Sequence, residues 1–422
     1  MIRHICKIIW NERKANGWIL VEFIVVFCIL WFCCDYLSYI VRSNSEPVGF
    51  DIDHTYQIQM SRKTQYEPQE GEETDHNALI QTFVNRVKQY PGVENIAFSN
   101  AAAPYLGSLS RSSMQYLPDS IWIGARIRYV TSEFFDVFKM KLESGRIFNW
   151  EDKAESWNVI VSGNRNGCFE YTDEDKKKME LPLSKMKAFY NDYEKREYPI
   201  IGVVNPTKEG SYSYYDPGIY YPLSQVDLND EIVIRVSPHA DKDFAERFTK
   251  EMREQLDLGP YFLSSVISLQ KRKEMILNYS GITGNLNSIY AISSFLVINI
   301  FLGLIGTFWY RVQSRRSEIG TRISMGASKK NVKRMLFGET LILLFIASFV
   351  AVNICLNIAQ TDFLEAIGLP ESQRDYIGAG IEQDFINYFV TYLFLAVVSL
   401  FAVWYPARQA VSVPPAEALR EE

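Results

Sequence analysis

Two long hydrophobic stretches flank a short basic segment, and this arrangement limits the fold more than any other feature of the sequence. Ile289–Tyr310 has no charged residue in 22 positions, and Met335–Ile358 has one, Glu339, in 24. At 1.5 Å per residue, each stretch can cross a hydrocarbon core about 30 Å thick as an α-helix. The segment between them, residues 311–334, carries eight Lys/Arg and one acid. Because basic loops stay on the cytoplasmic side, the sequence predicts a helical membrane protein with this segment in the cytoplasm.

Two further apolar stretches complete four predicted spans. Residues 18–41 form the first, interrupted only by Glu22 before its polar end, and Phe385–Tyr405 forms the last, which Pro406 should end. A cleavable signal peptide is the alternative for 18–41, but the apolar run is too long and lacks a small-x-small cleavage site. The basic, amphipathic segment 1–17 favours a helix on the inner membrane surface.

Two acidic residues lie within the predicted spans. Glu22 is either a functional carboxylate within the membrane or, as we expect, a residue that snorkels to the interface or pairs there with a lysine or arginine. We expect Glu339 to pair with Lys333 or Arg334. In the second span, Asn299, Gly303 and Gly306 are candidate residues for close helix packing, because small residues let helices approach and an asparagine can bond across an interface. They serve equally well for an internal contact within one bundle.

The large region between the first two spans is polar and alternates helical and strand patterns. The chain is 47% hydrophobic but its mean hydropathy is −0.10, which indicates a few spans joined to one large polar domain. Strands and short helices in this mixture predict an α+β domain on the outer side. The expected helices are 77–89, 132–138 and 241–256, with a helical stalk over 261–287; the expected strands are 56–60, 93–98, 121–130, 157–162, 198–204, 218–221 and 231–236.

Few residues in this region have a catalytic or metal-binding pattern. Asp51-Ile-Asp53-His54 superficially resembles a metal cluster, but no second ligand pair accompanies it, so we expect no metal site. Cys168 is the only cysteine there, which excludes a disulfide within the domain. No Gly-x-Ser-x-Gly occurs. The basic residues lie beside the membrane and no nucleic-acid-binding motif is present, so we expect contacts with membrane lipid and none with nucleic acid.

The basic segment carries a family signature. Its order Arg-Arg-x-Glu-Ile-Gly-x-Arg-x-x-x-Gly-Ala-Ser resembles that of FtsX/MacB-type permeases of ABC transporters. Gly326 suits the positive φ that ends a helix, and Ser328 suits the cap of the next, so a bent helix pair is expected. In the family this segment meets an ATPase at the cytoplasmic face. The resemblance therefore assigns ATPase coupling to Arg315, Arg316, Glu318, Ile319, Gly320, Arg322, Gly326, Ala327 and Ser328.

Weaker fragments extend the resemblance along the chain. Tyr90–Glu94, Glu133–Phe138, Ser144–Phe148 and Ile200–Val204 occur in an order similar to that of the MacB-like periplasmic domain, and the tail around Pro415–Arg420 resembles the family's C-terminus. Residues 163–199 depart most from the pattern. We expect a solvated insertion there or a contact with a partner.

The resemblance implies a permease that changes conformation but does not itself hydrolyse nucleotide. No Gly-x-x-x-x-Gly-Lys-Ser/Thr occurs in the sequence, so the chain is not expected to be an enzyme or to hold a cofactor; ATP and Mg would be bound by an ABC-type ATPase partner. A second permease protomer, the same or different, and a periplasmic adaptor are further expected partners. The expected function is mechanical transmission to the outer domain for export or extraction of an amphiphilic, peptide or lipoprotein client.

Two alternatives remain open at this stage. One is an FtsX-like regulatory permease that controls a cell-wall hydrolase without transport, and the other is a receptor or scaffold without an ATPase. Localisation in a cell inner membrane, with both termini cytoplasmic, follows from the resemblance and the charge pattern. The expected layout is an amphipathic segment (1–17), first span (18–41), periplasmic α+β domain and stalk (42–284), second span (285–310), coupling segment (311–334), third span (335–358), periplasmic loop (359–385), fourth span (386–405) and cytoplasmic tail (406–422).

Overall fold

The computed structural model divides into two compact units, a helical unit of residues 1–42 and 284–422 and an α/β unit of residues 43–283. The structure describes residues 9–411 except 12, 67–74, 108–109, 117–120, 150–151, 153–155, 164–167, 170–177, 180–186, 192–193, 214, 216–217 and 360–380. The start of the amphipathic segment, most of the loop 359–385, much of 163–199 and the tail beyond 411 therefore lie outside the described residues.

Four helices in the described part of the chain are long and apolar enough to cross a membrane, which confirms the four-span prediction. They are α2 (Arg13–Ser45), α7 (Ile282–Ser314), α9 (Lys329–Ala359) and α12 (Ile381–Ala410), and a short helix, α8 (Arg316–Ser324), lies between α7 and α9. The candidate spans within them are Asn16–Ser45, Ile282–Ser314, Lys329–Ile358 and Phe385–Gln409.

The helical unit is held by a shared apolar core to which all five helices contribute. Trp31 of α2 stacks on Tyr388 of α12, with ring centroids 5.5 Å apart. Next to this stack, the Asn387 amide donates to Asp35 Oδ1 at 2.8 Å in a buried position. Because a polar pair in an apolar core must satisfy itself, this bond fixes how α2 and α12 face each other.

The expectation that Glu22 pairs with a lysine or arginine is wrong. Its Oε2 accepts a hydrogen bond from the Thr307 hydroxyl of α7 at 3.2 Å. Glu22 is the tenth residue of α2, where the neighbouring helix supplies a hydroxyl. The contact thus joins two spans.

Pro406 does not end the last helix, as the sequence analysis expected. Helix α12 continues through it to Ala410. Ala407 and Val411, on the far side of the proline, are buried in the helical core, and this packing offsets the backbone hydrogen bond that the proline removes. Residues 381–385, expected in a loop, belong to the start of the same helix.

The α/β unit is built on one mixed sheet of eleven strands in the described residues. Its strands are β1 (Thr55–Arg62), β2 (Val93–Asn100), β3 (Arg111–Tyr116), β4 (Ile121–Val130), β5 (Leu142–Gly145), β6 (Val159–Ser162), β9 (Ala188–Asn191), β10 (Arg196–Val204), β11 (Gly218–Pro222), β12 (Glu231–Val236) and β13 (Tyr261–Ser268). Strands β7 (Cys168–Phe169) and β8 (Lys178–Met179) pair separately.

Six of these strands close into a ring. The pairings run β11–β6–β10–β9–β3–β4, and β4 pairs in parallel with β11 to complete the circuit. The ring encloses a small core that includes Ile127, Val161 and Phe189. From β4 the sheet continues as an open arm in the order β2–β12–β1–β13.

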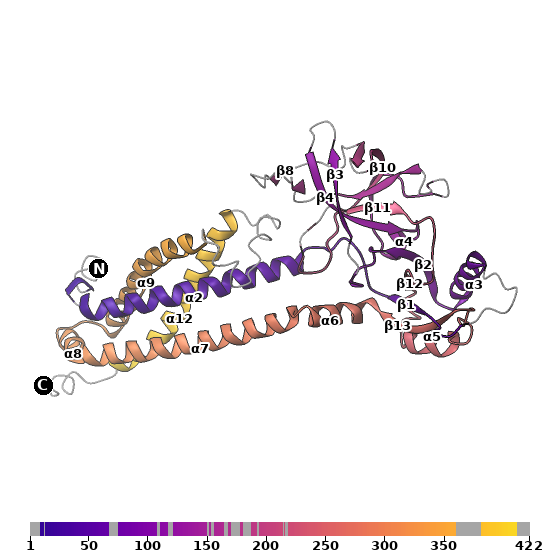
Figure 1. Ribbon diagram of the computed structural model, residues 1–422. Helices are drawn as coiled ribbons and strands as arrows, with labels where there is room; N and C mark the ends of the chain where they lie inside the picture. The colour runs from indigo at the N-terminus through magenta and orange to yellow at the C-terminus, as the bar shows by residue number, and fades with distance from the viewer. Residues whose placement is uncertain are drawn as a thin grey trace. The chain divides into compact units, whose positions relative to one another are not determined.

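Helices cover the open arm of the sheet. Figure 1 shows α3 (His76–Gln89) and α5 (Phe244–Met252) beside these strands, and Phe83, Phe244 and Phe248 pack against the sheet with no more than 1% exposure. The short helix α4 (Phe134–Val137) supplies three buried side chains to a second core. Helix α6 (Leu269–Tyr279) follows β13.

Most predicted elements of this unit are confirmed, but the stalk is partly wrong. Residues 261–268 are strand β13, antiparallel to β1, and only 269–279 form a helix before α7. Tyr261 and Leu263 are buried on alternate positions, which is a strand period, whereas the apolar spacing of 262, 266 and 269 also fits a helix. Pairing with β1 decides between the two. The helix expected over 241–256 is shorter, Phe244–Met252.

A buried lysine holds the first residues of the α/β unit in place. Lys208, whose side chain is 0% exposed, donates from Nζ to the Ser43 carbonyl at 3.0 Å and lies 2.9 Å from Glu46 Oε2. Its ammonium also lies 4.9 Å from the centre of the Tyr215 ring, and Tyr215 Oη donates to the Pro47 carbonyl at 2.6 Å. The segment that follows α2 is therefore held against Lys208 and Tyr215.

We predict that Lys208→Met speeds the exchange of backbone amide hydrogens where the chain enters the α/β unit. The substitution keeps the apolar stem but leaves Glu46 without its buried counter-charge, at a cost of about 2 kcal/mol. Hydrogen exchange of the Lys208 amide, which bonds to the Val48 carbonyl, should speed up roughly thirtyfold. Lys242→Met, at an exposed lysine of the same unit, is the matched control and should change nothing. Equal protection in both variants would contradict the anchoring role.

A second buried charge, Asp152, lies between β5 and β6 and joins three described residues of that region. Asp152 accepts from Arg146 Nη2 at 2.9 Å, from the Asn149 amide at 2.8 Å and from Asn158 Nδ2 at 2.7 Å. The Arg146 hydrogen bond, helped by those from the Asn149 amide and the Asn158 side chain, lowers the pKa of Asp152 from 3.8 to about 2. The carboxylate form is thus the one the fold requires.

The lowered pKa sets a pH window for this contribution. Because the folded pKa lies below the unfolded value, the stabilisation is complete above about pH 4 and is lost as the pH falls toward 2. We expect Asp152→Asn to lower the free energy of unfolding by about 1–2 kcal/mol at pH 7 and to flatten its change between pH 4 and 2. Denaturant unfolding at both pH values measures this. Asp136→Asn, at an exposed aspartate, should leave both values unchanged.

Candidate functional site

The segment between the second and third spans folds into a sharp corner. Helix α7 ends at Ser314 and α8 starts at Arg316, so Arg315 is the joint between them. Helix α8 ends in a Schellman motif: the Ala327 amide bonds to the Arg322 carbonyl and the Gly326 amide to the Ile323 carbonyl, each at 3.0 Å. Gly326 has φ +93°, which confirms its predicted conformation.

The next helix begins at once. Ser328 Oγ accepts from the Asn331 amide at 3.3 Å, which confirms the predicted cap of α9. One residue, Ala327, separates the glycine that ends α8 from the serine that starts α9. The chain therefore reverses within a few residues, and the bent helix pair expected from the sequence is present.

Five charged side chains join α7, α8 and α9 in what we call the corner network: Arg311, Arg315, Glu318, Arg322 and Glu339. The Glu339 carboxylate, 2% exposed, accepts from Arg315 Nη1 at 2.8 Å and from Arg311 Nη2. Arg315 Nε donates to Glu318 Oε2 at 2.9 Å, and Arg322 Nη2 donates to Glu318 Oε1. Glu339 is thus the buried anion that ties the end of α7 to α9.

The expected pairing of Glu339 with Lys333 or Arg334 is wrong. Those residues lie five and six positions before it on α9, whereas side chains on one helix meet at three or four positions. The partners Arg311 and Arg315 come instead from another helix and its joint. Arg311 was not among the predicted site residues; the signal that could have found it is the occurrence of one arginine and one glutamate at the facing ends of two neighbouring spans.

The remaining predicted coupling residues divide between the core and the surface. Ile319, 2% exposed, and Gly320 are buried against the helical core, where Val312, Val332 and Leu336 also lie. Arg316 and Ala327 are half-buried, and Ser328 is exposed. At the apex, Met325 is 75% exposed although its side chain is apolar. The corner thus has a packed interior and a solvent-exposed tip.

The three residues predicted to pack spans lie in different environments on α7. The Asn299 amide donates to the Phe295 carbonyl of its own helix at 2.8 Å, so it makes no bond to another span in the described residues. A Cβ on Gly303 would lie 3.5 Å from Glu22 Oε1, which places this glycine against α2. Gly306 has open space around it.

Asp51 and His54, two of the residues that superficially resembled a metal cluster, contact charged side chains of other segments. Asp51 Oδ2 lies 2.9 Å from Lys139 Nζ and 3.5 Å from Arg235 Nη1. His54 Nδ1 lies 3.0 Å from Asp241 Oδ2. These contacts hold the residues that precede β1 to Lys139, Arg235 and Asp241.

The fold and the corner define a membrane protein with four helical spans and a large α/β domain between the first two. The family model for the MacB-like periplasmic core domain matches residues 38–251, and the model for the C-terminal part of FtsX-like permeases matches residues 290–415. The chain belongs to the FtsX/MacB-type permease family of ABC transporters. It is accordingly an inner-membrane protein with a periplasmic-type core domain.

Curated relatives support the same family. The chain is 26% identical over 249 residues to the macrolide export ATP-binding/permease protein MacB of Aggregatibacter actinomycetemcomitans, and 25% identical over 252 residues to MacB of Neisseria gonorrhoeae. Each match covers 56% of this chain and 36% of the relative, so the chain spans about a third of their length.

Among solved structures, the periplasmic region of MacB from Actinobacillus actinomycetemcomitans matches 56% of this chain and 98% of its own, at 16% identity and a TM-score of 0.30. A TM-score this low adds nothing to the family assignment.

Proposed function

We propose that this chain is the transmembrane part of an ABC-type transporter and transmits ATP-driven movement from an ATPase to its periplasmic domain. The observation that supports this proposal best is the corner network. It braces α8 between two spans through a buried carboxylate and leaves one apolar residue, Met325, at the tip. A push on that tip would move α7 and α9 together, because the ion pairs oppose their separation.

The corner suits contact with a protein rather than with lipid alone. An exposed methionine adapts its shape to an apolar partner surface, and the lysines that follow it, Lys329 and Lys330, are exposed as well. We place this face, and with it both chain ends, in the cytoplasm, in accord with its eight basic residues. ATP and Mg would be bound by the ATPase.

The names of the relatives indicate the kind of transport that we propose. Those of Aggregatibacter and Neisseria are named for macrolide export and for ATP binding. By analogy, we propose export or extraction of an amphiphilic, peptide or lipoprotein client, with an adaptor as a further partner. The match to a MacB-like core domain over 38–251 favours this role over the regulation of a hydrolase.

We also propose that a second permease protomer, the same or different, packs on α7. Only 6% of the most apolar window of α7 is buried in the chain, against 33–44% for the other three spans. Phe295, Asn299, Leu302, Gly306 and Tyr310 follow one another at three- and four-residue steps and are all exposed. Such a stripe, with a glycine and an amide, fits helix association in a membrane.

Co-purification of an ATPase tests the main proposal. The tagged chain would be extracted from its own membrane in mild detergent and labelled with a photoreactive ATP analogue. We expect a labelled ATP-binding partner in the eluate, displaced by excess ATP. Recovery of the chain as a single folded species without any ATP-labelled component would overturn the proposal.

A further inference from the structure

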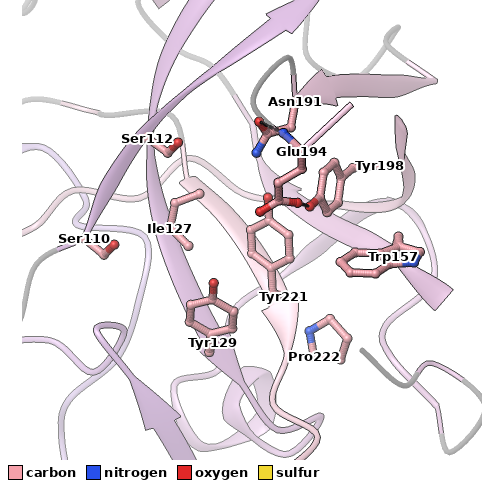
Figure 2. A pocket seen from close by; sticks show the side chains of 10 residues that line it. All are labelled: Ser110, Ser112, Ile127, Tyr129, Trp157, Asn191, Glu194, Tyr198, Tyr221 and Pro222. Atoms are coloured by element: carbon pink, nitrogen blue, oxygen red, sulfur yellow. Dashed lines mark hydrogen bonds between the residues drawn. The ribbon is translucent and has the colours of Figure 1, made fainter. Parts of the chain in front are cut away.

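The closed strand ring of the α/β unit has a pocket at its surface that the transmission role does not use. Its volume is about 250 Å³. The lining comes from five strands and the segments next to them, which are far apart in the sequence: Ser110, Ser112, Ile127, Tyr129, Trp157, Asn191, Glu194, Tyr198, Tyr221 and Pro222. Figure 2 shows these side chains gathered around one space.

Aromatic rings form a continuous wall of this pocket. Tyr129 lies 5.4 Å from Tyr221 between centroids, Tyr221 lies 5.4 Å from Tyr198, and Tyr198 lies 5.7 Å from Trp157. The last two pairs meet edge to face, at 86° and 84°. Ring faces carry negative charge density, so a wall of this kind attracts cations. Tyr129 is 41% exposed, which leaves this wall open to a ligand.

The pocket has one formally charged residue, and it is acidic. Glu194 stands in the turn between β9 and β10, and Tyr198 Oη donates to its Oε2, as the dashed line in Figure 2 marks. The Glu194 amide donates to Asn191 Oδ1 at 3.2 Å, which fixes the turn. Tyr198 is the only hydrogen-bond donor to this carboxylate among the described residues. One carboxylate oxygen therefore remains for a ligand.

The tyrosines remain neutral hydrogen-bonding groups in this setting. Burial, with the nearby Glu194 carboxylate, raises the pKa of both Tyr198 and Tyr221. Neither phenol ionises near neutral pH. The pocket thus combines one fixed negative charge with neutral aromatic walls.

One cation–ring contact with this aromatic wall already exists within the chain. The Arg196 guanidinium lies 4.2 Å from the centre of the Trp157 ring. A cation thus already rests on one ring of the same aromatic wall. The volume is smaller than the 300–1,000 Å³ typical of sites for drug-sized ligands, so it admits one group of a ligand and not a whole large molecule.

We propose that this pocket binds a cationic nitrogen group, an alkylammonium or a guanidinium, with Glu194 as its counter-ion and Tyr129 and Tyr221 as its walls. The group is carried either by a small organic amine or by a lysine or arginine of a peptide. This proposal concerns the α/β unit and does not depend on the ATPase.

Calorimetric titration of the full chain in lipid nanodiscs tests the pocket. The probes are phenethylammonium and the blocked tripeptide Gly-Arg-Gly, each with a neutral analogue, phenethyl alcohol and Gly-citrulline-Gly. We expect one or both cations to bind with a dissociation constant near 1 mM and the neutral analogues to bind at least tenfold more weakly. Binding of the amine alone would identify small amines as the source, and binding of the tripeptide alone would identify peptides.

Three variants distinguish this site from binding elsewhere. Glu194→Gln and Tyr129→Ala should each weaken binding about three- to tenfold, since exposed cation–ring contacts and single ion pairs have energies of this order. Glu197→Gln, at an exposed acid of β10 that does not line the pocket, should leave the affinity unchanged. Absence of heat with both cations at about 10 mM, or equal binding by all three variants, would overturn the proposal.

Discussion

Replacing Glu339 by glutamine is expected to destabilise the helical unit strongly. The carboxylate is 2% exposed and is the shared partner of Arg311 and Arg315, which are 8% and 7% exposed. Glutamine keeps the shape but removes the charge, so the two buried guanidinium groups lose the carboxylate they share, and Arg315 keeps only its pairing with the more exposed Glu318. Breaking a buried pair in this way costs about 3–5 kcal/mol. Thermal unfolding of the purified chain in detergent should show a clearly lowered midpoint.

Glu318→Gln is the matched control for this experiment. Glu318 belongs to the same network and pairs with Arg315 and Arg322, but its side chain is 38% exposed. Solvent screens that pair, so its loss should cost no more than about 1 kcal/mol. Equal losses in the two variants would mean that burial of Glu339 does not organise the corner.

Met325→Asp is expected to abolish capture of the ATPase while leaving the fold intact. Met325 is 75% exposed at the tip of the corner, so its replacement removes little internal packing. In a complex with a partner, however, the new carboxylate would be buried without a counter-ion, and a central apolar contact would be lost. We predict at least a tenfold fall in the amount of ATPase that co-purifies, with an unchanged thermal midpoint. Quantitative binding to the immobilised chain measures the capture, and thermal unfolding of the purified variant measures the midpoint.

The control for Met325→Asp is the same substitution at another exposed methionine. Met275 on α6 is 47% exposed, and Met275→Asp should bind the ATPase normally. Charge reversal of Arg315 is a poor substitute, because that residue is buried in the corner network and its reversal would disrupt the fold itself. Normal capture by Met325→Asp would show that the tip is not the contact.

Local sequence patterns were sufficient for much of the corner. Gly326 and Ser328 were predicted to end one helix and start the next, and both do so, because a positive φ and a side-chain cap are requirements of a few neighbouring residues. The spans were found for a similar reason: length and apolar content suffice to define them.

Contacts between distant residues were not predictable in this way. Glu339 pairs with Arg311 and Arg315, 28 and 24 positions away, and the residues next to it on α9 instead offered Lys333 and Arg334 as local partners. The strand β13 was mistaken for a helix because its partner β1 lies about 200 residues earlier. The aromatic pocket is hidden for the same reason, since ring closure between β4 and β11 brings Tyr129 beside Tyr221.

The coupling proposal depends most on whether the tip at Met325 touches an ATPase. A photoreactive amino acid, benzoylphenylalanine, placed at position 325 and, separately, at position 275 would report this contact in native membranes. We predict a nucleotide-sensitive adduct between the chain and a P-loop ATPase from position 325, and none from position 275. No ATPase adduct from 325, in membranes where the chain is folded and the ATPase is present, would contradict the proposal.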